Sequence, residues 1–420
     1  MKRSLFVLLI ALLICALVCG SASATQTDSD SGDSAAESES PQNSETTGDG
    51  NTGTDSQSGT GAPFKVNAEA AILIDASSGR VLYEQNPHER MAPASTTKIL
   101  TALLVLENVD DLSATVTLPA DFDNVGESSI YLEPGETITY ESLLYALMLR
   151  SANDAAQALA IGVAGSEEQF VEMMNVRSEE LGLKDSHWAN PHGLDAPQHY
   201  TSAYDLAMLS KAAIQIPKFN ELIKTTSYTL PWADYEYDRV IYNHNQFLDM
   251  YEGADGIKTG FTDDAGSCLV GSVTRNDMRL IGVVLKAAEN DEHNGHYAAM
   301  TSLMDYGFES YTSKVLGTKG QVVGSIPISG AKVKSVDVVL GSDVMMPVMT
   351  QSNYEPQSTF DYPKSLQAPV SKEEPIGHAT YIGEDGNIVT VDLYLAESLD
   401  RYTFATVLKQ VWDKFISALL

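Results

Sequence analysis

Residues 92–104 read Ala-Pro-Ala-Ser-Thr-Thr-Lys-Ile-Leu-Thr-Ala-Leu-Leu, and the rest of the chain is organised around this stretch. It predicts the start of a helix that is too apolar to lie at the surface, with Pro93 in its first turn. Ser95 and Lys98 are three residues apart and therefore share a face of that helix. Burial lowers the pKa of a lysine because it disfavours the charged form, so Lys98 is a candidate base for the Ser95 hydroxyl.

A Ser-x-x-Lys pattern alone has low specificity, because it occurs by chance in many chains of this length. A capping serine followed by a solvated lysine explains it equally well. The catalytic interpretation therefore needs partner groups elsewhere, and two further polar clusters are candidates. These clusters are Ser151-Ala152-Asn153 and Lys258-Thr259-Gly260.

The first of these clusters lies where the pattern predicts a bend. A helical stretch at 140–149 ends at Arg150, and an alanine-rich helix follows Asp154. Ser151 and Asn153 would face different directions on a continuous helix, whereas on a bend both side chains can point into a cleft.

The first 24 residues have the organisation of a secretory signal peptide. Basic residues precede an apolar run and the small residues Ala22-Ser23-Ala24, so we expect cleavage after Ala24. A lipoprotein anchor at Cys19 is the alternative, although the bulky Val18 precedes that cysteine. After cleavage at Ala24 only Cys268 is left, which excludes an internal disulfide. The apolar run around Cys268 predicts a buried thiol.

The chain of 420 residues is strongly acidic. Its net charge is −31, and loss of the two basic residues of the signal makes it −33. Such a surface repels the phosphate backbone, so we expect no nucleic-acid partner. Residues 25–62 are almost free of apolar side chains and predict a disordered acidic linker.

Residues 63–317 combine strands with a helical block. A hairpin is predicted between Ala68 and Glu84, helices follow, and the runs at 254–273 and 278–287 are strand-like. This order predicts an α+β domain in which helices pack on an antiparallel sheet.

Short strands recur in residues 318–398, among them 335–340, 344–349 and 388–395, and predict a small all-β domain with a β-sandwich fold. Residues 399–420 place apolar side chains on one helical stripe. This amphipathic helix is suited to lying on a membrane surface, and docking on its own β-domain is the alternative.

Three polar clusters in this order, in an exported chain, resemble the serine β-lactamases and penicillin-binding proteins. Within that superfamily the sequence is similar to the low-molecular-mass D-alanyl-D-alanine carboxypeptidases, the serine peptidases of family S11. The likeness covers nearly everything after the linker and implies a penicillin-binding/β-lactamase-like domain, a β-domain and an amphipathic tail. It includes Arg150-Ser-Ala-Asn-Asp154, Asn190-Pro-His-Gly-Leu-Asp195 and Asp255-Gly-Ile-Lys-Thr-Gly260.

The resemblance implies a catalytic role for the first two clusters. Ser95 would attack the carbonyl between the two terminal D-alanines of a peptidoglycan stem pentapeptide and form an acyl-enzyme, with Lys98 as its base. Ser151 would relay the proton to the leaving amine. Asn153 would bind the substrate amide and help to fix Lys98.

The resemblance also implies how substrate is bound. Lys258 and Thr259 would hold the terminal carboxylate, and Gly260 would let an extended peptide lie against the strand edge. The N–H groups of Ser95 and Phe261 would form the oxyanion hole. Strand alternation puts Lys258 and Gly260 on one face and Thr259 on the other, so the role of Thr259 rests on the resemblance alone.

The same resemblance implies partners and location. β-Lactam antibiotics would inhibit the enzyme covalently, and the protein would act at the outer face of the cytoplasmic membrane and in the cell wall, attached peripherally by its C-terminal helix. We expect no cofactor. His293 and His296 have a spacing that could hold a metal, but no third ligand accompanies them.

Two positions depart from the family's pattern. Phe261 stands where some relatives have histidine, and His244 stands where relatives can carry arginine. The resemblance therefore leaves open which group contacts the substrate carboxylate from the side of His244. Arg279 is one candidate, and a solvated arginine at a strand end is the alternative. His192 is expected to be structural, because Lys98 already supplies the base.

Two other functions compete with the carboxypeptidase. A serine β-lactamase shares the three clusters but needs a carboxylate for deacylation, and no motif with glutamate lies suitably between the second and third clusters. An inactive wall-binding or scaffolding protein would be expected to have lost at least one of the polar groups.

Overall fold

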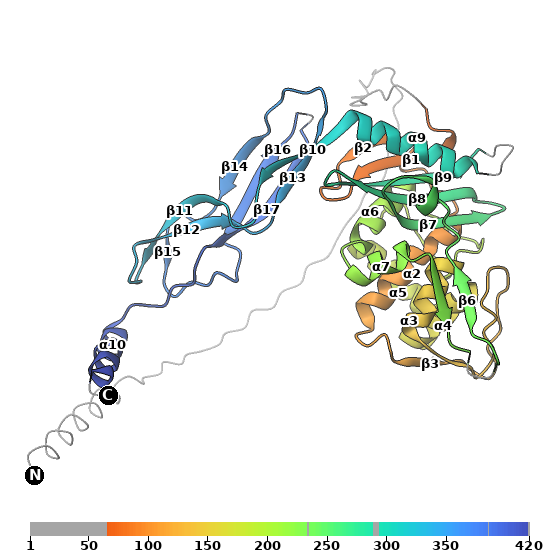
Figure 1. Ribbon diagram of the computed structural model, residues 1–420, viewed down its shortest axis with the longest axis horizontal. Helices are drawn as coiled ribbons and strands as arrows, with labels where there is room; N and C mark the ends of the chain where they lie inside the picture. Colours follow the sequence, from red (N-terminus) through yellow and green to blue (C-terminus); the bar gives the residue numbers. More distant parts are fainter. Residues whose placement is uncertain (1–64, 233–234, 289–293, 385, 419–420) are drawn as a thin grey trace, which may run out of the picture. The chain divides into compact units, whose positions relative to one another are not determined.

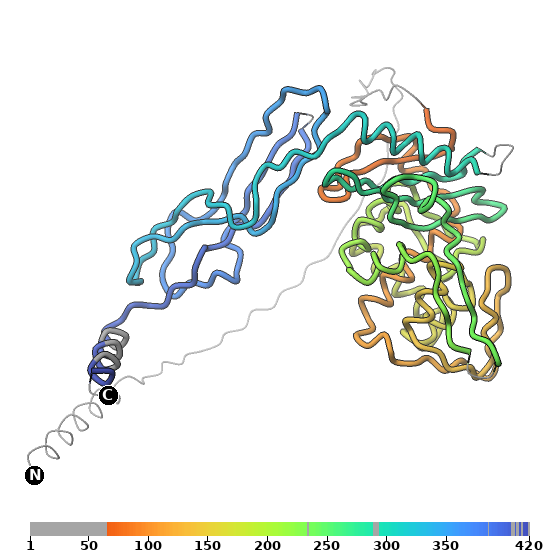
Figure 2. The backbone as a smooth tube through the Cα atoms, in the orientation of Figure 1, coloured from red at the N-terminus to blue at the C-terminus, as the bar shows by residue number. Residues whose placement is uncertain are grey.

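The computed structural model describes residues 65–232, 235–288, 294–384 and 386–418 (Figures 1 and 2). The predicted signal peptide at 1–24 and the predicted linker at 25–62 lie outside these residues, as does His293.

An antiparallel five-stranded sheet is the centre of the first domain, which confirms the predicted α+β class. The strand order is β2-β1-β9-β8-β7, so β7 is an edge strand with one side unoccupied by any strand of the described chain. The strands are β1 (Ala68–Asp75), β2 (Val81–Gln85), β7 (Ala254–Thr262), β8 (Gly266–Arg275) and β9 (Met278–Ala287).

Helices cover both faces of this sheet (Figure 1). Helix α9 (Gly295–Ser310) packs on one face, and α2 (Lys98–Asn108) and α6 (Ala203–Ala213) pack on the other. Successive side chains of a strand point to opposite faces. Val283 and Val284 of β9 are nevertheless both fully buried, which is why this strand reads as an unbroken apolar run.

The remaining helices and strands of the domain form the helical block and two two-stranded antiparallel sheets, β3-β4 and β5-β6. They are β3 (Thr115–Thr117), β4 (Thr137–Thr139), α3 (Tyr140–Tyr145), α4 (Asn153–Ala164), α5 (Glu167–Glu180), α7 (Pro217–Lys224), β5 (Ser227–Leu230), β6 (Arg239–Tyr242) and α8 (Phe247–Met250).

The run predicted as one strand at 254–273 is two strands, β7 and β8, joined by a turn at 263–265. A distant carboxylate closes this turn: Asp195 accepts hydrogen bonds from the Thr262 hydroxyl at 2.7 Å and from the Asp264 amide at 3.3 Å. The run is strand-like, as predicted, but the turn within it was not predicted, because the carboxylate that stabilises it lies almost seventy residues away in the sequence.

The C-terminal domain is all-β, as predicted. A six-stranded sheet has the order β14-β16-β17-β12-β11-β15, and β10 (Tyr311–Gly317) pairs separately with β13 (Val344–Met349). The strands of the larger sheet are β11 (Val322–Ser329), β12 (Ser335–Leu340), β14 (Gln357–Asp361), β15 (Leu366–Gln367), β16 (Gly377–Ile382) and β17 (Ile388–Leu395). Alternate residues of β12, namely Val336, Val338 and Leu340, point into its core.

The last described element is helix α10 (Phe404–Ser417). Large apolar side chains on it are exposed, among them Phe404, Leu408, Val411, Trp412 and Phe415. None of the helices in the described residues is both long enough and apolar enough to span a bilayer.

Candidate active site

The predicted nucleophile lies on a short 3₁₀ turn, η1 (Ala94–Thr97), which leads into α2 at Lys98. The sequence predicted that an α-helix begins here. In the structure the first turn is a 3₁₀ turn, and the α-helix begins at Lys98. Side chains three residues apart are eclipsed in a 3₁₀ turn. This alignment brings Lys98 Nζ to 3.0 Å from Ser95 Oγ. The Thr97 hydroxyl holds the turn by donating to the Ala94 carbonyl at 2.8 Å.

The Lys98 amine is completely buried. It hydrogen-bonds to Asn153 Oδ1 at 2.8 Å and to the carbonyl oxygen of His192. Burial lowers the pKa of Lys98 well below its ordinary value, and the charge of Lys258 lowers it further. A neutral amine has two hydrogens, which these two oxygens accept. Its lone pair is therefore left for the Ser95 hydroxyl, as a general base requires.

The second amine, Lys258 of β7, is also buried, and its Nζ donates to the Thr259 carbonyl at 2.9 Å. Burial lowers the pKa of Lys258 to about 7. Two positive charges in one buried site are unfavourable. Because the charge of Lys258 adds to the effect of burial on Lys98, whereas burial alone lowers the pKa of Lys258, we assign the neutral state to Lys98 and the proton to Lys258.

Strand β7 passes directly beside the nucleophile turn. A Cβ atom added to Gly260 would lie 3.1 Å from the Ser95 backbone nitrogen, so the absent side chain permits this close approach. Phe261 is the next residue, and its side chain is exposed. Thr259 is half-buried.

Ser151 and Asn153 lie on the predicted bend. The π-helical turn η2 (Ala146–Arg150) ends at Ser151, whose φ of +61° is left-handed, and α4 begins at Asn153. Such a conformation costs a non-glycine residue about 1–3 kcal/mol and is typical of functional sites. The Ser151 hydroxyl is buried and has no hydrogen-bond partner among the described residues, whereas Asn153 Nδ2 donates to the Gly126 carbonyl at 3.0 Å.

Asp154 is a supporting residue to which sequence reasoning assigned no role. Its carboxylate is fully buried and accepts hydrogen bonds from Ser129 Oγ at 2.6 Å and from the amides of Ile130 and Leu132 at 3.2 and 3.0 Å. These bonds attach the segment 124–136 to the start of α4, beside Asn153. The sequence shows the acidic residue in the first turn of a helix, but its donors lie in a remote loop.

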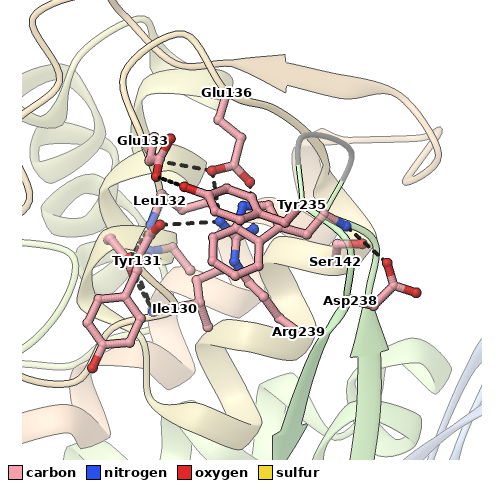
Figure 3. A network of polar contacts seen from close by, with 12 residues as sticks. Ile130, Tyr131, Leu132, Glu133, Glu136, Ser142, Tyr235, Asp238 and Arg239 are labelled. Atoms are coloured by element: carbon pink, nitrogen blue, oxygen red, sulfur yellow. Dashed lines mark hydrogen bonds and ion pairs between the residues drawn. The ribbon is translucent and has the colours of Figure 1, made fainter.

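The same segment is fixed on its other side by Arg239 of β6 (Figure 3). The guanidinium binds both oxygens of Glu136 at 2.6 and 2.9 Å and donates to the Tyr131 carbonyl at 3.2 Å. Both charged side chains are nearly buried, so loss of one partner would leave an uncompensated charge. Segments about a hundred residues apart are thus held side by side next to the site (Figure 2).

Two buried histidines contact the residues next to the nucleophile, His199 at Thr97 and His192 at Lys98. His199 Nδ1 accepts the Ala189 amide at 2.9 Å, so Nε2 carries the proton and donates to Thr97 Oγ1 at 2.9 Å. Burial lowers the pKa of His199 to about 4 and that of His192 to about 3. Both imidazoles are therefore neutral, which agrees with structural roles.

These histidines predict a loss of stability in acid. Between about pH 4 and pH 6.5 the unfolded chain binds protons that the folded chain excludes, so stability falls as pH falls, by about 1.4 kcal/mol per pH unit for each histidine. In urea unfolding from pH 4.5 to 6, His199→Gln is expected to reduce the slope by about that amount while retaining a donor for Thr97. An unchanged slope would show that His199 is not excluded from protonation.

Other candidate residues are placed outside the catalytic cluster. Arg279 is neither solvated nor free for substrate, because it pairs with Asp255 at 3.1 Å and donates to Asn220 Oδ1 at 2.7 Å. Cys268 is fully buried, and burial raises the pKa of its thiol to about 11, so it is a poor nucleophile. The described residues contain no group of three or more potential metal ligands.

Comparison with known proteins agrees with this arrangement. Residues 56–289 match the family model described as D-alanyl-D-alanine carboxypeptidase, and residues 311–401 match that of the C-terminal domain of penicillin-binding protein 5. The carboxypeptidase DacF of Bacillus subtilis is 33% identical over 362 residues, which cover 83% of this chain and 90% of the relative. DacD of Escherichia coli is 33% identical over 80% of this chain and 88% of its own length.

Solved structures show the same fold. Penicillin-binding protein 5 of Haemophilus influenzae has a TM-score of 0.66 at 27% identity and covers 81% of this chain and 99% of its own. A peptidoglycan synthesis regulatory factor (PBP3) of Streptococcus pneumoniae has a TM-score of 0.70 at 28% identity and covers 80% of this chain and 100% of its own.

Proposed function

The chain belongs to the D-alanyl-D-alanine carboxypeptidase family of serine hydrolases, and we propose that it removes the terminal D-alanine from peptidoglycan stem pentapeptides through an acyl-enzyme on Ser95. The observation that carries the proposal is the 3.0 Å contact between Ser95 Oγ and the buried Lys98 amine, whose two hydrogens have other acceptors. The reaction needs a base that is uncharged near neutral pH, and this environment supports one.

In the acylation step, Ser95 Oγ attacks the carbonyl carbon of the penultimate D-alanine while Lys98 Nζ takes the hydroxyl proton. The N–H groups of Ser95 and Phe261 stabilise the resulting oxyanion. The C–N bond then breaks, and Ser151 relays the proton from Lys98 to the leaving amine. Its unpartnered buried hydroxyl is suited to this relay.

In the second step a water molecule attacks the ester carbonyl while Lys98 takes its proton. Lys98 then returns this proton to Ser95 Oγ as the ester bond breaks, which releases the shortened peptide and restores the neutral amine. The peptide backbone would lie along the free edge of β7, where Gly260 leaves room beside the nucleophile turn. Lys258 and Thr259 would hold the terminal carboxylate, Lys258 by its charge and Thr259 by its hydroxyl.

The same geometry supports covalent inhibition by β-lactams, which present a strained amide to Ser95. We would incubate the mature protein with a diacetyl-L-lysyl-D-alanyl-D-alanine peptide and assay free D-alanine, and in parallel map the penicillin adduct by mass spectrometry. The expected results are D-alanine release and a persistent adduct on Ser95. Rapid turnover of penicillin would favour a β-lactamase, and absence of both products would favour an inactive scaffold.

We further propose that the protein is exported and that α10 attaches it to the membrane surface. Phe404, Leu408, Val411 and Phe415 recur at helical spacing, and their exposed side chains would enter the interface between lipid head groups and acyl chains.

Deleting residues 402–420 is therefore expected to move the enzyme from the membrane to the soluble fraction without changing kcat/KM on a soluble peptide. Flotation with anionic phospholipid vesicles measures the first effect. The matched test in the full chain is Trp412→Glu with Phe415→Glu, which keeps the helix length but charges its apolar face. Equal flotation of all three proteins would contradict attachment through α10.

A further inference from the structure

The side chain of Arg150, directly before Ser151, has an unusual partner. Its Nη1 lies 2.6 Å from Nε2 of His244. Several other arginines pair with a carboxylate, namely Arg90, Arg177, Arg239 and Arg279. Within the described parts of the chain no aspartate or glutamate forms an ion pair with Arg150. Its charge is therefore not neutralised by any carboxylate of the described residues.

The partner histidine is held in position from both sides. The His244 amide donates to the Leu149 carbonyl at 3.0 Å, which attaches it to the turn that carries Arg150. The Tyr297 hydroxyl donates to the His244 carbonyl at 3.3 Å and accepts the Gln246 amide at 3.1 Å. The imidazole therefore has a fixed place beside the bend.

The protonation state of this pair follows from its geometry. A guanidinium can only donate, so His244 Nε2 accepts and the ring is neutral, with its proton on Nδ1. Partial burial lowers the pKa of His244, and the positive charges of Arg150 and Lys258 lower it further. The imidazole thus orients the guanidinium without cancelling its charge.

The surroundings of the pair are electropositive. Arg150 contacts the His244 imidazole, and the positive charge of Lys258 also acts on it and lowers its pKa. Arg279, the arginine that sequence reasoning considered for substrate, is occupied by Asp255 and Asn220. Arg150, which directly precedes Ser151, is therefore available to an anion that binds there.

We infer that Arg150 is a substrate-binding residue for the C-terminal carboxylate of the scissile peptide, and that His244 is the positioning residue for its guanidinium. This inference rests on the proposed function. It identifies the group that contacts the substrate carboxylate from the side of His244, where relatives can carry an arginine. A guanidinium offers two parallel N–H groups that match the two oxygens of a carboxylate, which an ammonium group does not.

The experiment compares two substrates, diacetyl-L-lysyl-D-alanyl-D-alanine with a free C-terminus and the same peptide as its C-terminal amide. A charge-assisted hydrogen bond contributes about 1.5–3 kcal/mol. Arg150→Gln is therefore expected to raise KM for the acid about 10- to 100-fold, with kcat changed by less than about threefold, and to abolish the preference for acid over amide. Arg150→Lys is expected to fall between the two.

His244 variants test the positioning role. His244→Ala is expected to raise KM for the acid by a smaller factor, about 3- to 10-fold, and His244→Gln is expected to restore part of the loss, because its amide oxygen can accept from Arg150. Arg177→Gln is the control, since Arg177 pairs with Glu107 and Glu180 on helices away from the bend, and it is expected to keep the wild-type preference.

The outcomes separate the two proposals. Wild-type release of D-alanine together with an unchanged acid preference in Arg150→Gln would overturn the role of Arg150 alone. A wild-type protein that released no D-alanine and formed no penicillin adduct would overturn the proposed function and this inference with it. The rate of penicillin acylation gives an independent reading, because penicillin also carries a carboxylate: Arg150→Gln is expected to lower it.

Discussion

Lys98→Ala is expected to reduce acylation of Ser95 by penicillin about 10²–10⁴-fold, the range that a positioned general base contributes. Lys98 is the basic group that contacts the Ser95 hydroxyl, whereas the second amine, Lys258, contacts the Thr259 carbonyl and Asn153 is not basic. Stopped-flow measurement with a fluorescent penicillin gives the rate constant. Ser95→Ala, by contrast, is expected to form no adduct at any time, because it lacks the nucleophile.

Chemical rescue makes this test specific to the base. Lys98→Ala leaves a cavity in which a small alkylamine can take the place of the missing amine, so added ethylamine is expected to restore part of the acylation rate. Lys98→Met fills the same volume with apolar atoms and is not expected to be rescued. Thermal unfolding of each variant shows that the fold is intact. Acylation of Lys98→Ala at the wild-type rate would exclude Lys98 as the base.

Gly193→Ala is the second change with a large expected effect. Gly193 has a left-handed φ of +96°, and an added Cβ would lie 2.0 Å from the Ala94 carbonyl oxygen, far inside contact distance. Backbone strain and overpacking together are expected to lower the free energy of unfolding by about 2–6 kcal/mol. The clash also displaces the residue before Ser95, so D-alanine release and penicillin acylation are expected to fall together.

Gly182→Ala is the matched control. It has a similar left-handed φ of +74° but no atom within 4 Å of the added Cβ, so it isolates the backbone strain. We expect it to cost about 1–2 kcal/mol in urea unfolding and to leave acylation unchanged. Equal effects of the two substitutions on activity would contradict the close contact between Gly193 and the nucleophile turn.

The large effects expected for Lys98→Ala and Gly193→Ala have the same structural cause: segments that are distant in the sequence pack around the nucleophile turn. The His192 carbonyl accepts from Lys98, Gly193 lies against Ala94, and Gly260 lies against Ser95 from the other side. The catalytic hydroxyl and amine are thus held between a loop and an edge strand. Small backbone shifts in either the loop or the strand would therefore displace the reacting atoms. Catalysis depends on holding these atoms in a productive geometry.

Much of this molecule was predictable because the deciding signals are local. The apolar alternation of β12 acts over a few residues, and the structure has a strand at the predicted positions 335–340. The cap of α6 by Ser202 and the left-handed Gly182 after α5 are equally local features. The spacing of Ser95 and Lys98 likewise places two side chains in contact on any helical turn. The three polar clusters identified the family for the same reason.

Contacts between segments that are far apart in the sequence could not be predicted in this way. The loop closed by Asp154 and Arg239, the occupation of Arg279 by Asp255 and the pairing of Arg150 with His244 each join groups 20 or more residues apart. Whether an arginine is neutralised or available depends on which carboxylate the fold brings to it.

The sequence by itself determined which residues are able to do the chemistry and on which local elements they lie, because hydrophobic period, turn residues and side-chain spacing act within a few residues. Only the tertiary structure decided their chemical state. An amine becomes a base when a buried environment disfavours its charge, and burial is a property of the whole packed domain.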